Sequence, residues 1–164
     1  MANTLVQCGL SLLVLACAAT RTDSTSSLAP TKLAPPANLQ DTILQVAIRD
    51  AIGYDSSATP RRVLLQPPPG VNARRILPPL RGTTFVTLSR TEFQRLADRT
   101  GTITRFVVGT PRLYEDSATV EIWVDSVTPR DSAIVSSGGG CTYILTRSTN
   151  GWRVEKRVTC IFLD

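Results

Sequence analysis

The chain has 164 residues, of which 18 are Lys or Arg and 13 are Asp or Glu, so its formal net charge is +5. It contains no histidine, which excludes Ser-His-Asp and Cys-His catalysis and any His-ligated metal site. The four cysteines form no C-x-x-C pair, which argues against a zinc finger, and we expect neither a metal nor another cofactor.

The first 19 residues have the pattern of an export signal. Residues 5–19 read LVQCGLSLLVLACAA, an uncharged apolar run that is short for a membrane span but suits the h-region of a signal peptide. Residues 14–17 read VLAC, which resembles the bacterial lipobox and implies that Cys17 carries a lipid. The alternatives are ordinary cleavage after Ala18 or Ala19 and retention of the segment as an anchor.

Residues 20–37 are rich in Ser, Thr, Pro and Ala, and we expect them to form a flexible tether. Such a composition buries too little apolar surface to offset the entropy lost on ordering. The tether leads to a single domain at residues 38–164. No charged residue follows Cys17 before Arg21, so an aspartate that retains lipoproteins at the inner membrane is absent. We therefore expect an envelope protein held at the outer membrane and facing the periplasm, or a secreted one.

The domain opens with a predicted helix over residues 38–52. Asn38 can cap this helix, and Gly53 suits the left-handed position that follows a helix. Apolar residues from Leu44 to Ile52 recur at helical spacing and form one stripe, so the helix is expected to lie across a sheet.

The segment from Tyr54 to Arg81 contains six prolines, which favours edge strands or polyproline turns around residues 63–65 and 76–77. A strand is predicted over residues 83–88. Ser89 and Glu92 then form a capping box, which predicts a short second helix that ends at Gly101.

Beyond residue 102 the hydrophobic period changes from 3.6 to 2, which predicts strands over residues 103–114, 118–127, 140–149 and 152–162. The predicted fold class is α+β. The N-terminal helix and the short second helix are expected to pack on a curved, mainly antiparallel sheet.

The last two predicted strands flank Asn150-Gly151, a strong hairpin signal. If this dipeptide is the two-residue turn, Cys141 faces Cys160 and Leu145 faces Lys156. Facing residues in antiparallel strands lie within disulfide range, and export favours oxidation. We therefore predict a disulfide between Cys141 and Cys160.

Three stretches near the C-terminus resemble the NTF2-like superfamily, also called SnoaL-like or cystatin-like. They are DSATV at residues 116–120, YILTR at 143–147 and GWRV at 151–154. The resemblance implies helices packed into a curved sheet, often around a cone-shaped cavity. The proline-rich residues 60–79 replace the family's usual second helix, and no catalytic motif of the superfamily matches, so no functional residue is carried over.

Four arginines form a candidate anion-binding surface: Arg61, Arg62, Arg74 and Arg75. No acidic residue occurs between Ser56 and Thr91, although a solvated irregular segment would explain the same composition. Phe85 is the one aromatic residue of this region, so the stacking platform of a single-strand nucleic-acid binder is missing and we expect no nucleic-acid partner.

Other candidate residues have a plainer interpretation. The run Gly138–Gly140 lacks the Lys-Ser/Thr of a phosphate loop and is expected to be a flexible lead into a strand. Trp123 and Trp152 are expected to pack in the core. Asp50, with Tyr54 and Asp55, could supply an acid–base pair, or could be polar residues at a helix end.

Two functions are compatible with these features. The first is a lipid-anchored, non-catalytic binding module of the cell envelope, whose partners are the membrane and an anionic envelope component or another envelope protein. The second is a cavity-type dehydratase or isomerase that uses a carboxylate and a tyrosine without a metal. The sequence predicts no oligomeric state.

Overall fold

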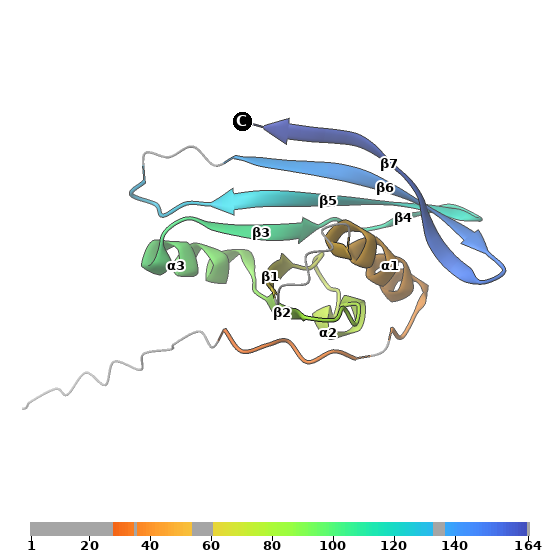
Figure 1. Cartoon of the computed structure of the whole chain (residues 1–164), viewed down its shortest axis with the longest axis horizontal. Coiled ribbons are helices and arrows are strands. Elements are labelled where there is room, and N and C mark those ends of the chain that lie inside the picture. The colour runs from red at the N-terminus through yellow and green to blue at the C-terminus, as the bar shows by residue number, and fades with distance from the viewer. Residues whose placement is uncertain (1–27, 35, 54–60, 133–136, 164) are drawn as a thin grey trace, which may run out of the picture.

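The structure, a computed structural model, describes residues 28–34, 36–53, 61–132 and 137–163. Within these ranges the fold is α+β, with three helices and an open, mixed sheet of seven strands (Figure 1). The elements are α1 (Leu39–Gly53), β1 (Arg61–Gln66), α2 (Ala73–Ile76), β2 (Thr83–Thr87), α3 (Arg90–Thr100), β3 (Ile103–Val108), β4 (Arg112–Leu113), β5 (Ser117–Val127), β6 (Gly138–Ser148) and β7 (Gly151–Leu163).

The predicted N-terminal helix is present as α1. The Asn38 side chain accepts a hydrogen bond from the backbone N–H of Asp41 at 2.8 Å, and the Asp41 carboxylate accepts one from the N–H of Ala37 at 3.0 Å. These bonds satisfy backbone donors at the start of the helix.

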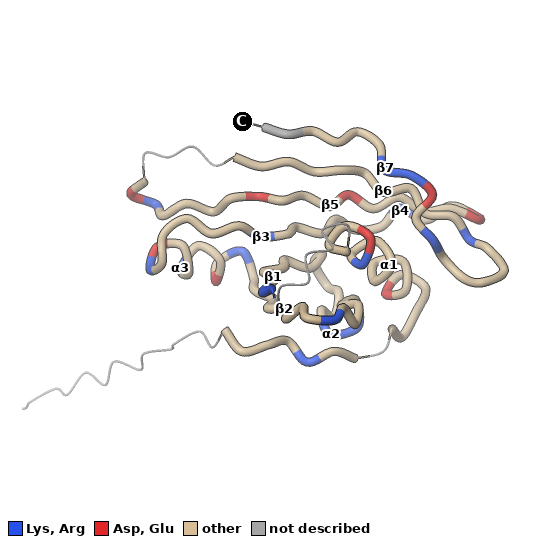
Figure 2. The backbone as a smooth tube through the Cα atoms, viewed as in Figure 1, with Lys and Arg blue, Asp and Glu red and all other residues tan. Residues whose placement is uncertain are grey.

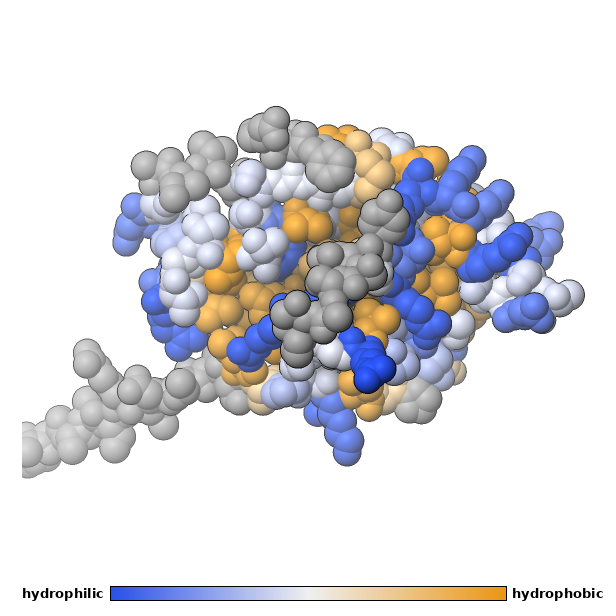
Figure 3. Space-filling view, viewed as in Figure 1, coloured by the Kyte–Doolittle hydropathy of each residue, from blue (hydrophilic) through white to orange (hydrophobic). Residues whose placement is uncertain are grey.

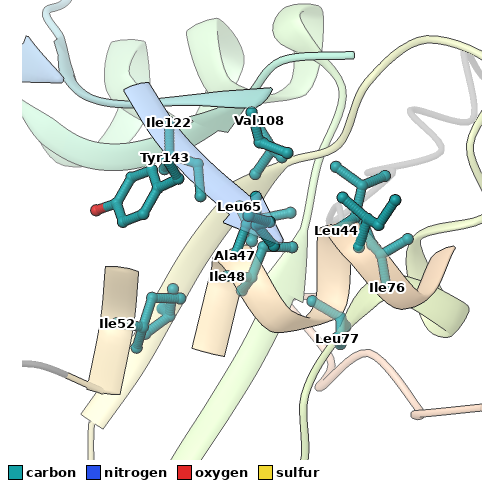
Figure 4. Close-up of a cluster of buried hydrophobic side chains, with 14 of the residues drawn as sticks. Leu44, Ala47, Ile48, Ile52, Leu65, Ile76, Leu77, Val108, Ile122 and Tyr143 are labelled. Atoms are coloured by element: carbon teal, nitrogen blue, oxygen red, sulfur yellow. The ribbon is translucent and has the colours of Figure 1, made fainter. Parts of the chain in front are cut away.

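The apolar stripe of α1 packs on one face of the sheet and forms the main core (Figure 4). Leu44 and Ala47 are fully buried there, and Ile48 is 1% exposed. Leu65 of β1 and Leu145 of β6 meet this stripe from the sheet. We call this side of the sheet the α1 face.

The sheet order is β2-β1-β3-β5-β6-β7, with β4 beside β5. β1 pairs in parallel with both β2 and β3, while the remaining pairs are antiparallel. The expectation of an edge strand at residues 63–65 is therefore wrong, because β1 lies between two partners. The prolines do not prevent this position, since Pro67 and Pro68 come after the last residue of β1.

Residues 76–77 were expected to be extended, but Ile76 ends the single helical turn α2. Asn72 caps this turn, since its side-chain oxygen accepts a hydrogen bond from the N–H of Arg74 at 3.1 Å. Ile76 is fully buried in the core on the α1 face.

The second predicted helix is α3, and it covers the opposite face of the sheet. Phe93 and Ala97 are fully buried there in a second cluster with Val86 of β2 and Val127 of β5. The parallel strands β1 and β2 therefore have α2 on one face and α3 on the other, as in α/β proteins.

Part of the predicted tether lies against the edge strand β2 (Figure 1). The N–H of Thr31 donates to the carbonyl of Phe85 at 2.7 Å, and the Thr31 hydroxyl accepts from the N–H of Thr87 at 3.0 Å. The N–H of Ala34 donates to the carbonyl of Arg74 at 2.6 Å. Residues 28–34 thus cover one edge of the sheet, which would otherwise present unpaired backbone groups.

The β6–β7 hairpin closes around Thr149 and Asn150, because Ser148 pairs with Gly151. The predicted turn was Asn150-Gly151, so the observed turn lies one residue earlier. Gly151, with a positive φ of 105°, is instead the first residue of β7. In consequence Leu145 faces Val154 and not Lys156.

Two register shifts along the hairpin then restore the predicted cysteine pairing. At the second shift, Thr159 and Cys160 together face Cys141, and Thr159 takes a positive φ of 50°. Cys141 and Cys160 have their sulfur atoms 2.11 Å apart, at disulfide distance, and their Cα atoms 4.1 Å apart.

The glycine run belongs to β6 and is not a flexible lead into it. Gly138 and Gly140 both pair with β5 and with β7. A Cβ at Gly140 would lie 2.5 Å from Cδ2 of Trp123, so the indole of Trp123 covers a position that has no side chain. The close approach of this ring to the backbone explains why glycine is required at residue 140.

We expect Gly140→Ala to lower the free energy of unfolding by about 1–3 kcal/mol, because the added methyl group overlaps the indole ring. Gly53→Ala is the matched control, since nothing lies within 4 Å of a Cβ at Gly53, and its effect should stay within about 1 kcal/mol. Urea unfolding measures both. In a Trp123→Leu background the cost of Gly140→Ala should shrink, and equal costs in the two backgrounds would contradict the contact with Trp123.

We also expect the Cys141→Ser/Cys160→Ser double variant to lose about 3 kcal/mol of unfolding free energy, because the bridge closes a loop across 19 residue steps. Reduced wild-type protein should unfold at the same urea concentration as this variant. A thiol assay on the denatured, unreduced domain gives the direct check: two reactive thiols would refute the bridge.

Candidate functional site

A polar cleft lies between α3 and the adjoining strands β3 and β5, and we call it the α3 cleft. Its volume is about 480 Å³, which is within the range of small-molecule sites. Three arginines, one acid, four uncharged polar residues and one valine line it: Arg90, Thr91, Gln94, Arg105, Asp125, Ser126, Val127, Thr128 and Arg130.

Arg105 forms the floor of the α3 cleft. Its Nε and Nη2 atoms donate to one carboxylate oxygen of Asp125 at 3.2 and 2.6 Å, and Nη1 donates to Oε1 of Gln66 at 2.8 Å. The guanidinium also lies over the ring of Phe93, 5.3 Å from its centroid. Because its side chain is only 12% exposed and held on three sides, Arg105 is a fixed positive charge.

Arg90 and Arg130 stand at the rim of the α3 cleft. The Arg130 side chain is 70% exposed, and its Nε lies 3.7 Å from a carboxylate oxygen of Asp98, which makes a loose ion pair. Hydrogen bonds from Gln94 and from the backbone N–H of Arg130 lower the pKa of Asp98, and the Arg130 charge adds to this effect. Asp98 therefore carries its charge at neutral pH and partly offsets Arg130.

The guanidinium of Arg90 makes no hydrogen bond or ion pair with any other residue that the structure describes. Arg90 is the first residue of α3 and is exposed. The α3 cleft therefore has one positive charge that is not balanced by a neighbouring carboxylate among the described residues.

A capping box fixes the position of Arg90. The Glu92 carboxylate accepts from the N–H of Ser89 at 2.7 Å, and the Ser89 hydroxyl accepts from the N–H of Glu92 at 3.3 Å. The hydrogen bonds with Ser89 lower the pKa of Glu92, with a smaller contribution from the Arg95 charge. The chain's own side chains thus satisfy the start of this helix, and Arg90 remains available at the cleft.

The four arginines predicted as an anion-binding surface serve different purposes. Arg61 donates through Nη2 to the carbonyl of Ile52 near the end of α1, and Arg62 donates through Nη2 to the carbonyl of Leu28. Arg74 and Arg75 are exposed on α2. Figure 2 shows the basic residues spread over several elements and not gathered at this one segment. Whether these arginines bind an anion stays a prediction.

The residues of the enzyme hypothesis are only partly described. Asp50 forms an ion pair with Arg157, whose Nε and Nη2 lie 2.8 and 2.7 Å from the same carboxylate oxygen. The Arg157 guanidinium lies over the Tyr143 ring, 5.7 Å from its centroid, and burial raises the pKa of Tyr143. The structure therefore pairs Asp50 with a cation, while Tyr54 and Asp55 lie outside the described residues.

Cys17 and the whole predicted signal peptide lie outside the described residues. Trp152 packs partly buried against the core on the α1 face, as expected. The described ranges contain no group of three or more Cys, Asp or Glu side chains that could hold a metal ion. None of the helices within them combines the length and hydrophobicity of a membrane span.

Sequence reasoning did not single out Arg105, Asp125 or Arg130. A signal for the first two was present, because Arg105 and Asp125 occupy facing positions in adjacent antiparallel strands. To recognise this pair from the sequence, one must know which residue of β3 faces which residue of β5. The residues between the two strands do not determine that register.

Comparison with known proteins adds no assignment: no protein family matches the chain, and neither a curated protein nor a solved structure matches it. The resemblance to the NTF2-like superfamily stays a prediction. Function must therefore be argued from the site itself.

We expect Ser89→Ala to lower the unfolding free energy by about 1 kcal/mol through loss of the cap. Glu92→Gln should also destabilise at pH 7, because the lowered pKa of Glu92 shows that the folded state favours its charged form. That contribution is present above the ordinary pKa of 4.5 and is lost as pH falls through the lower folded-state pKa.

The difference in stability between wild type and Glu92→Gln should therefore close in acid, as measured by urea unfolding from pH 7 to pH 3. Glu155→Gln, which changes an exposed carboxylate on β7, is the control and should show no such convergence. A gap for Glu92→Gln that stays constant with pH would contradict the role of the Glu92 charge.

Proposed function

We propose that the chain is an exported envelope protein, held at a membrane by lipid on Cys17, whose domain binds an anionic group without catalysis. The anchor is proposed from the lipobox-like residues 14–17, and the observation that carries anion binding is the charge of the α3 cleft. Three guanidinium groups line it against one carboxylate, and that carboxylate, Asp125, is already paired with Arg105. A cleft with an excess of positive charge favours an anionic ligand.

Binding is favoured over catalysis because the carboxylates of the candidate sites are already paired with arginines. Asp125 is bonded to Arg105, and Asp50 is bonded to Arg157. A general base must reach the proton that it removes, and one oxygen of each of these carboxylates is already occupied by a guanidinium. Turnover of a small molecule that is abolished by Asp50→Asn would instead support the dehydratase or isomerase hypothesis.

The docked segment at residues 28–34 supports a position close to the anchoring membrane. Ten residues separate Cys17 from Leu28, so a lipid on Cys17 would hold the domain within about 40 Å of the bilayer surface. Arg62 and Arg74 bind the backbone of this segment or lie beside it, so they share that side of the domain. Where exposed arginines come within a Debye length of an anionic surface, about 8 Å at physiological salt, they add a weak, salt-sensitive attraction.

Titration of the domain with butyrate, followed by amide NMR shifts, tests anion binding at the α3 cleft. We expect shifts at Arg90, Gln94 and Arg105, with binding that weakens from 50 to 300 mM salt. Arg90→Gln should weaken binding about fivefold, because roughly 1 kcal/mol of charge-assisted hydrogen bonding is lost. Arg99→Gln is the matched control, since it removes the same charge from the last turn of α3, outside the cleft.

The proposal fails if Arg90→Gln and Arg99→Gln bind butyrate equally, or if binding does not depend on salt. Shifts confined to Arg74 and Arg75 would place the anion at the predicted arginine surface instead.

The anchor is tested in cells by metabolic labelling with a radioactive fatty acid. We expect label on the wild-type chain and none on Cys17→Ala, because the thiol is the acceptor of the lipid. Cys8→Ala is the control, since Cys8 lies inside the apolar run and should not affect labelling. Equal labelling of wild type and Cys17→Ala would remove the anchor from the proposal.

A further inference from the structure

A second cleft adjoins the α3 cleft, and its chemistry is different. It has a volume of about 430 Å³ and is formed by residues 66–71 together with residues 87–90. Three consecutive prolines, Pro67, Pro68 and Pro69, supply much of its lining, with Val71 and Leu88 beside them. We call it the proline cleft.

The two clefts meet at Arg90, which lines both of them. They are linked a second time by Gln66, which lines the proline cleft and accepts the hydrogen bond from Arg105 on the floor of the α3 cleft. An apolar cleft and a basic cleft thus share a boundary. The residue at that boundary is Arg90, whose guanidinium makes no hydrogen bond or ion pair with the other described residues.

The topology of the sheet places this pair of clefts at a favoured position for ligands. The proline cleft is built from the segments that follow the carboxyl ends of β1 and β2, which are parallel neighbours. In open sheets with parallel strands and helices on both faces, ligands bind at the carboxyl ends of the strands. Here the segment after β2 is also the start of α3, which carries Arg90 into the site.

The charged side chains of the α3 cleft indicate the charge of the head group that a ligand would need. Asp125 balances Arg105, and Asp98 offsets part of the Arg130 charge through the loose ion pair at the rim. Arg90 remains as one positive charge, which matches the single negative charge of a carboxylate. A carboxylate also matches the fork of a guanidinium through two parallel hydrogen bonds.

We propose that the joined clefts bind a single-chain carboxylate of the fatty-acid type, with its carboxylate on Arg90 and its hydrocarbon chain along Pro67, Pro68 and Pro69. This proposal rests on anion binding at the α3 cleft and adds to it the apolar half of the ligand. The proline cleft supplies rigid apolar surface, so little side-chain entropy is lost when a chain covers it. Each half of the site then recognises one half of the molecule.

The test compares butyrate, decanoate and decanol, all kept below the concentration at which they aggregate. We expect decanoate to bind roughly sixtyfold more tightly than butyrate, because six added methylenes that are each about half buried contribute about twofold each. Decanol should bind about fivefold more weakly than decanoate, because it lacks the charge for Arg90 and loses roughly 1 kcal/mol of charge-assisted hydrogen bonding.

Pro69→Glu places a negative charge in the proline cleft at an exposed position and should remove most of the gain from decanoate while leaving butyrate binding within about twofold. Pro79→Glu is the matched control: it makes the same change at another exposed proline, which lines a separate cleft beside α2. It should leave both affinities unchanged.

The outcomes separate this inference from anion binding alone. Butyrate binding that depends on Arg90, with decanoate no tighter, overturns the inference and leaves the anion site intact. Decanol as tight as decanoate, or inorganic phosphate tighter than decanoate, overturns the carboxylate head on Arg90. If neither butyrate nor decanoate binds to folded protein, both proposals fall.

Discussion

The side chain of Arg105 joins four elements of the fold. It projects from β3, forms an ion pair with Asp125 of β5, donates to Gln66 at the end of β1 and lies over Phe93 of α3. A buried cation is costly unless its hydrogen bonds are satisfied, and here all three nitrogen atoms have acceptors. The same contacts therefore fix the position of α3 on the sheet and the position of the Arg105 guanidinium at the base of the α3 cleft.

The parallel half of the sheet explains why two clefts adjoin. A parallel pair of neighbouring strands requires a crossover, so the chain leaves β1 and β2 at the same end of the sheet. The crossover after β1 contains prolines and only one helical turn, while that after β2 contains α3. The crossover after β1 therefore lines the apolar proline cleft, and the crossover after β2 supplies α3, which lines the polar α3 cleft. Arg90 lies where the two clefts meet.

Signals that act over a few residues predicted the elements they concern. The stripe from Leu44 to Ile52 predicted α1, and Ser89 with Glu92 predicted α3, because helix burial and capping depend on neighbours within one or two turns. The cysteine pair was also predicted, although the turn was placed one residue late. The two shifts that correct the register depend on the backbone at Thr159 and along β7, and no dipeptide encodes them.

The parallel pairing of β1 and the α3 cleft could not be predicted in this way. β1 reads as a short apolar piece among prolines, and its two partners begin at residues 83 and 103, so pairing is decided by contacts distant in sequence. In the same way, the density of arginine between residues 61 and 75 suggested a site, whereas the charges of the cleft come from residues 90, 105 and 130.

Figure 3 shows apolar residues near the centre of one face and hydrophilic residues toward the end of the β6–β7 hairpin. Several of the described arginines already have partners. Arg61 and Arg62 bind backbone carbonyls, while Arg105 and Arg157 bind carboxylates. In a chain with net charge +5, counting arginines overstates the charge available to a ligand. What matters for recognition is the guanidinium that the fold positions but leaves unbonded by its described neighbours, and in the α3 cleft that group is Arg90.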